Sequence, residues 1–160
     1  MNNKERLNEI LIIRDLRRNL MNFDISNEEK AIILRALNEY EERLGFDIQE
    51  SIKNKEILED MNIKSDIDVV KIPIDENRPS YNELVNIRIG ISFHDIVLKI
   101  QDILSNETLF NIDTSSKKVL LSSLKEYCRS IQNLKLERET YKRDYPELFH
   151  EEELKNNINL

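Results

Sequence analysis

Two related segments lie 87 positions apart in this sequence. When residues 10–44 are aligned with residues 97–131 without a gap, 11 of 35 positions are identical. The clearest match pairs KAIILRALNEY, which begins at Lys30, with KKVLLSSLKEY, which begins at Lys117. Such a match indicates an internal duplication, so the two parts of the chain are expected to fold alike.

Each segment has the pattern of a helical hairpin. The first helix is expected to end near Asn19, and an N-cap for the second helix follows at Ser26 in one copy and at Asp113 in the other. After each cap, apolar residues recur at a spacing that forms one narrow stripe along an α-helix. The stripes consist of Ile33, Leu37, Tyr40 and Leu44 in the first copy and of Leu120, Leu124, Tyr127 and Ile131 in the second.

Composition also favours an all-α fold. Two glycines and three prolines among 160 residues are too few for the many chain reversals of an all-β fold. We therefore predict a single helical domain, a bundle of two sequence-related hairpins with approximate twofold symmetry, joined by a short acidic helix and an extended strap. Its expected parts are repeat unit one (4–45), an insertion (46–79), repeat unit two (80–145) and a tail helix (146–160).

The insertion is the most acidic part of the chain. Gly45 is expected to end the preceding helix, and residues 46–63 are expected to form a separate short helix. Residues 67–74 favour an extended conformation, and Pro73 restricts such a segment to a sheet edge or to a covering strap. The sequence therefore predicts a break in helical structure between the two hairpins.

The start of repeat unit two has two interpretations. Ser80 and Glu83 have the spacing of a capping box, which favours one continuous helix as far as Leu104. In the alternative, isoleucines alternate over residues 87–91 in a short strand, and the helix begins at Ser92. We favour the continuous helix, because apolar residues recur at helical spacing along the whole segment.

The last long helix is expected to run from about Ser116 to Arg143 and to extend beyond its partner helix. Its apolar stripe continues through Leu134 and Tyr141, but Arg138 falls on the same face. The stripe is therefore expected to leave the core near Leu134. The turns that follow are a candidate contact for a partner.

Basic residues mark the places where the two repeats differ. Three arginines cluster on the first helix, and uncharged residues occupy the equivalent positions in the second copy. On the last long helix, four basic residues share one face at about 100° per residue. These groups could meet an acidic partner or phosphate, or they could rest against the protein's own acidic insertion or face water. The candidate partner-binding residues are Arg14, Arg17, Arg18, Lys118, Lys125, Arg129, Arg138, Tyr141 and Arg143.

Charge and cysteine content restrict the possible environments and partners. The net charge of −7 opposes bulk attraction to nucleic acid or to anionic lipid. One cysteine cannot form an internal disulfide, so a reducing compartment is expected. No apolar run approaches the ~20 residues of a membrane span, and the N-terminus lacks the apolar core of a signal peptide. We therefore expect a cytoplasmic protein without a membrane partner.

The sequence contains no recognisable catalytic or cofactor signature. His94 and His150 each lack a second histidine nearby, and no glycine-rich phosphate loop is present. Arg129 could lower the pKa of the Cys128 thiol, but no histidine is placed locally to act as its base. We therefore expect no enzyme activity, no cofactor and no metal site.

The leading hypothesis is a non-enzymatic protein-binding regulator or inhibitor, of the kind found in phages, mobile elements or toxin–immunity systems. It would bind another protein through complementary surface patches, as a monomer or a small homo-oligomer. One alternative is a nucleic-acid-binding regulator that uses the basic face of the last long helix. Another is a metal protein that uses helix-borne carboxylates and a histidine.

Overall fold

The protein is helical throughout the part of the chain described by the computed structural model, which comprises residues 1–76, 81–87, 93–106 and 111–149. The regular structure of these residues consists of α-helices and short 3₁₀ helices, with no strand among them. This confirms the prediction of an all-α fold. None of the helices in these ranges is long and apolar enough to cross a membrane.

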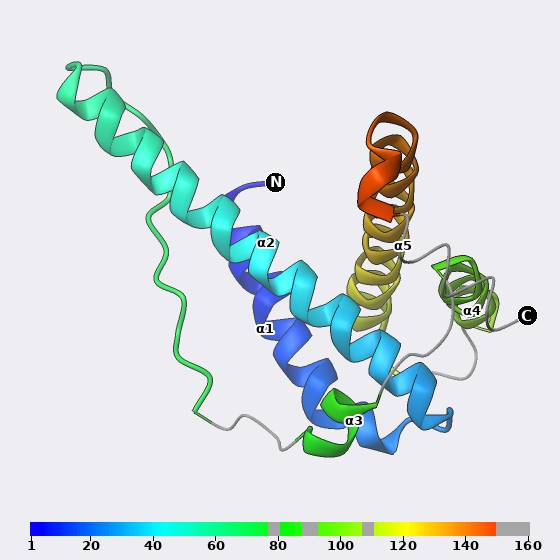
Figure 1. Ribbon diagram of the computed structural model, residues 1–160. Helices are drawn as coiled ribbons and strands as arrows, with labels where there is room; N and C mark the ends of the chain where they lie inside the picture. The colour runs from blue at the N-terminus through cyan, green and yellow to red at the C-terminus, as the bar shows by residue number, and fades with distance from the viewer. Residues whose placement is uncertain (77–80, 88–92, 107–110, 150–160) are drawn as a thin grey trace, which may run out of the picture.

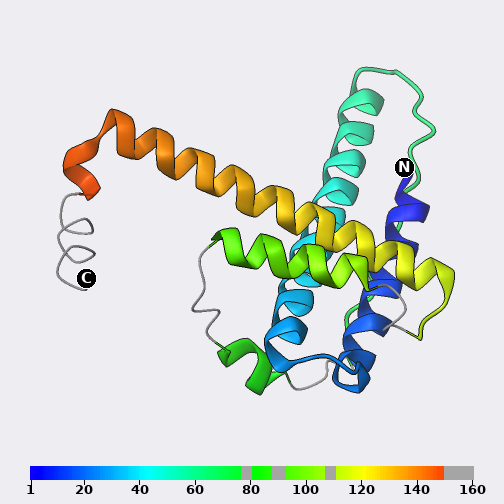
Figure 2. The same cartoon turned by 90° about the vertical axis from the view of Figure 1, so that its right-hand side faces the viewer.

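The helices form two hairpins that cross one another (Figures 1 and 2). The first hairpin joins α1 (Asn3–Asn19) to α2 (Asn27–Asp60) through the short 3₁₀ helix η1 (Leu20–Asn22). The second hairpin consists of α4 (Phe93–Ser105) and α5 (Thr114–Asp144). The short helix α3 (Asn82–Asn86) precedes it, and the 3₁₀ helix η3 (Pro146–Phe149) follows it.

The two long helices begin at equivalent positions of the repeat, and both have the expected N-caps. The Ser26 hydroxyl accepts a hydrogen bond from the Glu29 backbone N–H at 3.2 Å. In the second hairpin, the Asp113 carboxylate accepts one from the Ser116 backbone N–H at 2.7 Å. Each cap satisfies a backbone donor that the first helical turn leaves without a partner.

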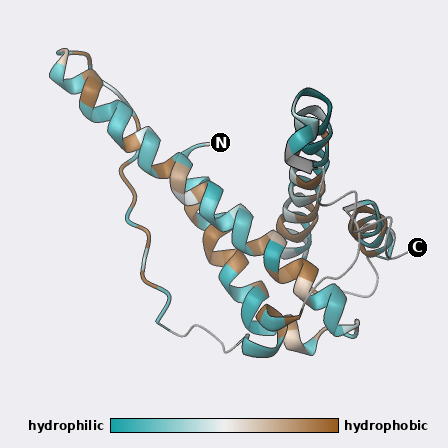
Figure 3. Cartoon of the chain, in the orientation of Figure 1, coloured by the Kyte–Doolittle hydropathy of each residue, from teal (hydrophilic) through white to brown (hydrophobic). Residues whose placement is uncertain are grey.

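The core lies where the hairpins meet, and hydrophobic positions concentrate there in Figure 3. Both predicted apolar stripes, one on α2 and one on α5, are buried in this core. Burial of matching positions agrees with a duplicated hairpin, while the approximate twofold symmetry stays a prediction. The buried stripe residues are Ile33, Leu37, Tyr40, Leu44, Leu120, Leu124, Tyr127 and Ile131.

The expected helix stop at Gly45 is wrong, because α2 continues through this residue to Asp60. A glycine inside a helix costs only about 1 kcal/mol relative to alanine, and burial of Leu44 and Ile48 on either side offsets that cost. The predicted short helix over 46–63 is therefore the second half of α2.

α2 ends at Asp60 with Met61 as its C-cap, and Asn62 follows with a left-handed backbone of φ 61°. The Ile63 backbone N–H then donates to the Leu58 carbonyl at 2.9 Å. A left-handed residue followed by this backward hydrogen bond is a common way for a helix to end.

The predicted strap is present and longer than expected, over residues 63–76. It has an extended backbone and runs back along the first hairpin (Figure 1). Val70 and Ile72 pack against the core from this segment. The strap thus covers one side of the hairpin formed by α1 and α2.

The continuous helix expected over 80–104 is also wrong. The helix α3 ends at Asn86, Ile87 has an extended backbone with ψ of 114°, and α4 begins at Phe93. The sequence between them combines β-branched isoleucines with a glycine, and both residue types weaken a helix. Ser80 and most of the alternative strand lie outside the described residues, and the N-cap of α3 is Tyr81 without a side-chain hydrogen bond.

The last helix, α5, extends beyond the core. Its last buried residue is Ile131, and all residues from Gln132 to Asp144 are exposed. Residues 132–144 form the overhang, which stands clear of the rest of the bundle in Figure 2. Only η3 is described from the predicted tail helix, and its later residues lie outside the described part of the chain.

Replacement of Gly45 by alanine is expected to stabilise the protein by about 0.5–1 kcal/mol, because alanine loses less chain entropy in a helix. The added Cβ would lie 3.8 Å from Ile72 Cδ1, which is ordinary van der Waals contact. Urea unfolding followed by circular dichroism measures the change. A helix stop at this position would give the opposite sign, since a left-handed glycine does not tolerate a Cβ.

The Asp113 cap is expected to make stability depend on acid pH. The hydrogen bond from Ser116 holds the pKa of Asp113 below its ordinary value of 3.8 in the folded protein. The resulting stabilisation is present above that ordinary value and is lost as the pH falls through the lower folded value.

Asparagine accepts the same cap bond without titrating. The melting temperature of Asp113→Asn should therefore approach or exceed that of the wild type as the pH falls from about 6 to 2. Thermal melts across this pH range test the expectation. A constant difference between the two proteins would contradict it.

Candidate functional site

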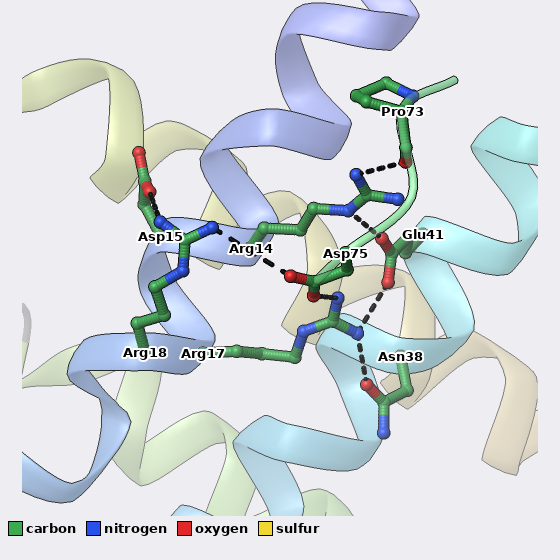
Figure 4. A network of polar contacts seen from close by, with 8 residues as sticks. All are labelled: Arg14, Asp15, Arg17, Arg18, Asn38, Glu41, Pro73 and Asp75. Atoms are coloured by element: carbon green, nitrogen blue, oxygen red, sulfur yellow. Dashed lines mark hydrogen bonds and ion pairs between the residues drawn. The ribbon is translucent and has the colours of Figure 1, made fainter. Parts of the chain in front are cut away.

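Arg17 lies at the centre of a buried polar network where α1, α2 and the strap meet (Figure 4). Its side chain is only 5% exposed. The guanidinium donates to Asn38 Oδ1 at 2.7 Å and forms an ion pair with Glu41. Its other terminal nitrogen lies 3.5 Å from Asp75 Oδ2 of the strap. A buried arginine requires such compensation, because an unpaired charge is costly away from water.

Two more arginines of α1 join this network, since positions three and four apart share one face of a helix. Arg14 Nε lies 2.9 Å from Glu41 Oε1, and its Nη1 donates to the Pro73 carbonyl at 2.6 Å. Arg18 Nη2 lies 3.9 Å from Asp75 Oδ1. The predicted cluster of Arg14, Arg17 and Arg18 is thus brought together, and its observed contacts are with the protein's own carboxylates.

The strap is held through its backbone carbonyls. Asn3 Nδ2 donates to the Asp68 carbonyl at 2.7 Å, and Lys55 Nζ donates to the Ile67 carbonyl at 3.1 Å. These bonds add to the one that Arg14 makes with the Pro73 carbonyl. Contact of the arginines with the acidic insertion was one of the expected alternatives, and Asp75 provides it; Glu41 lies outside the insertion and was not predicted as a partner.

A cleft of about 400 Å³ lies beside this network, between Arg17 and the strap residue Ile72. Arg14 and Arg17 face Glu41 and Glu42 across it, so its charges balance. The cleft therefore has no net preference for an anion or a cation.

The four predicted basic residues of α5 lie on an exposed face. Within the described residues, Lys118, Lys125 and Arg129 form no ion pair or hydrogen bond, and Arg143 pairs with its neighbour Asp144 at 3.2 Å. Lys118, Lys125, Arg129 and Arg143 make up the cationic stripe. In contrast to the arginines of α1, the first three lack a carboxylate from the described part of the chain.

The overhang carries the remaining predicted residues, and both are exposed. Tyr141 is 56% exposed, and its ring centroid lies 6.2 Å from that of Tyr145. Arg138 lies on the same helix and is exposed as well. Leu134 is 51% exposed and Ile131 is the last buried residue of the stripe, so the stripe leaves the core near Leu134, as expected.

Repeated residues also meet where α2 crosses α5. A small cavity of about 200 Å³ lies at this crossing. Glu126 in its lining forms an ion pair with Arg43. Burial, followed by repulsion from Glu42, raises the pKa of Glu39. The lining consists of four pairs of repeat-equivalent residues, Ala36 and Ser123, Glu39 and Glu126, Tyr40 and Tyr127, and Arg43 and Ser130.

Comparison with protein families, curated sequences and solved structures gives no match. The function of the protein is therefore inferred from the chemistry of its surfaces.

Cys128, His94 and His150 are the residues that the sequence offered for a nucleophilic or metal role. Burial raises the pKa of the Cys128 thiol, which lowers its reactivity at neutral pH. His94 is exposed, and His150 lies outside the described residues. No three histidine, cysteine, aspartate or glutamate side chains among the described residues are grouped as a metal site would require.

Removal of the strap carboxylate by Asp75→Ala is expected to destabilise the fold by about 1–3 kcal/mol, because Arg17 stays buried with one ion pair fewer. Asp15→Ala is the matched control, since the Asp15 side chain is 67% exposed and its ion pair among the described residues is with Arg18. The control should change the free energy of unfolding by less than about 0.5 kcal/mol. Equal losses in urea unfolding would show that Asp75 does not anchor the strap.

Proposed function

We propose that the protein is a non-enzymatic protein-binding regulator or inhibitor that recognises an acidic partner surface through the cationic stripe. The observation that carries this proposal is the contrast between two basic groups. The arginines of α1 are neutralised by Glu41 and Asp75. Lys118, Lys125 and Arg129 remain exposed without such partners in the described structure.

Complementary charge suits a role in recognition. Positive side chains along one helix face attract an acidic protein surface, speed its approach and fix its orientation. A net charge of −7 disfavours nucleic acid as the partner, because the chain as a whole repels a phosphate backbone. The stripe is also specific to the second hairpin. The residues at the positions of Lys125 and Arg129 in the first copy are Asn38 and Glu42.

The repeat supports an origin for this difference. We infer that duplication of one hairpin produced two copies with similar buried stripes and different exposed surfaces. In the first hairpin, Asn38 accepts a hydrogen bond from Arg17 and so serves the fold. In the second, Lys125 faces solvent. The second copy, which lacks the contact that Asn38 makes in the first, is therefore available to bind a partner.

Reversal of three stripe charges, by Lys118→Glu, Lys125→Glu and Arg129→Glu together, is expected to weaken partner binding by about tenfold or more. The side chains are exposed, so the fold should persist. The measurement is affinity purification from the native cells with wild type and variant, followed by binding assays with the purified partner.

The matched control carries Lys53→Glu, Lys64→Glu and Lys71→Glu, which change the net charge equally on an exposed part of the insertion. This control should retain the partner. Equal capture by all three proteins would overturn the proposal. Salt-dependent binding to DNA that only the stripe variant loses would favour the nucleic-acid alternative instead.

A further inference from the structure

The cavity of about 200 Å³ where α5 crosses α2 has the size of a pocket for one side chain (Figure 2). Its space arises because Ala36 and Ser123, the buried residues of its lining that face one another in the repeat alignment, are both small. Tyr40 and Tyr127 also line it. Pockets for small molecules usually measure roughly 300–1,000 Å³, so this cavity suits a single side chain better than a whole ligand.

The charges around this pocket are incomplete by one cation. Arg43 of α2 forms an ion pair with Glu126 of α5. The repeat-equivalent of Glu126 is Glu39, and that of Arg43 is Ser130. The same ion pair in reverse would join Glu39 to residue 130, but a serine does not supply the charge. Within the described residues, the Glu39 carboxylate forms no ion pair or hydrogen bond.

The surroundings of Glu39 disfavour its negative charge. Burial, followed by repulsion from Glu42, raises the pKa of Glu39. A positive group beside this carboxylate would oppose both effects, because a nearby opposite charge favours the ionised form. A metal ion is a poorer occupant, since no three histidine, cysteine, aspartate or glutamate side chains are grouped in the described ranges.

An arginine side chain matches the pocket better than a lysine. A guanidinium is planar, forms paired hydrogen bonds with a carboxylate and stacks on aromatic rings, whereas an ammonium acts as a point charge. Tyr40 offers its ring to such a group, because its hydroxyl already donates to Glu9 Oε2 at 2.6 Å. Arginine is also among the residues that contribute most to binding at protein interfaces.

We propose that this pocket binds one arginine side chain of a partner protein, with the guanidinium beside Glu39 and Ser130. The incoming arginine serves Glu39 as Arg43 serves Glu126. The chain thus provides one of two equivalent cations itself and takes the other from its partner.

The cationic stripe lies next to this pocket. Lys125 and Arg129 directly precede the pocket residues Glu126 and Ser130, so they lie on the adjacent face of α5. A partner surface that carries carboxylates beside an arginine therefore reaches both. This inference rests on the protein-binding role proposed above and adds an arginine to the chemistry of the partner.

Titration of the full chain with acetyl-arginine methylamide, followed by NMR, provides the test. Amide signals of residues 36–43 and 123–130 should shift saturably, with a dissociation constant on the order of 1 mM for so small a probe. The citrulline analogue, which lacks the charge, should bind about tenfold more weakly or worse. The lysine analogue, which lacks the planar fork, should also bind more weakly.

Ser130→Arg supplies the missing cation from within the chain and should weaken binding of the probe by about tenfold or more. Gln132→Arg is the matched control, because it adds the same charge at an exposed position of α5. Glu39→Gln should also weaken binding, whereas Glu56→Gln, at an exposed position of the same helix, should leave it unchanged.

Absence of saturable shifts, equal binding of the citrulline analogue, or equal effects of Ser130→Arg and Gln132→Arg would overturn the inference. So would binding of agmatine about tenfold tighter than that of the probe, since the ligand would then be a free small molecule. The two proposals also fail separately. A partner lost with the stripe variant but kept with Ser130→Arg would leave the proposed function intact and remove the arginine pocket.

Discussion

The helices α2 and α5 cross where their apolar stripes meet, and the two hairpins are joined there. Tyr40 and Tyr127 lie on either side of this crossing, and Arg43 of α2 forms an ion pair with Glu126 of α5. Burial of both stripes contributes about 25 cal/mol for each Å² of apolar surface removed from water. The direction in which α5 leaves the core, and hence the position of the overhang, follows from this crossing.

The far halves of the long helices α2 and α5 differ in whether another segment lies along them. The far half of α2 is accompanied by the strap, which is anchored by Lys55 near the helix end and by the arginines of α1 further along. The far half of α5 has no such cover in the described structure. The arginine cluster of the first hairpin is thus neutralised within the fold, while the second hairpin presents the cationic stripe to solvent.

Features that depend on neighbouring residues were predictable from the sequence, and features that depend on distant ones were not. The caps at Ser26 and Asp113 and both apolar stripes are local patterns, and the structure confirms them. Gly45 was misassigned because burial on both sides of it outweighs its weak helix preference. Asp75 and Arg17 are separated by 58 positions, so their pairing depends on the path of the strap. For the candidate site, the sequence indicated which residues are basic but not which of them the fold neutralises.

Asn3, Arg14 and Lys55 donate hydrogen bonds to backbone carbonyls of the strap. Every amino acid provides such a carbonyl. Val69 and Ile74 of the same segment are 65% and 86% exposed. Substitutions at such positions leave the course of the segment unchanged. During evolution, these exposed positions can therefore change, while Val70, Ile72 and Asp75 of the same segment remain tied to the hairpin beneath it. Divergence among descendants of this chain would accumulate at the exposed positions without loss of the fold.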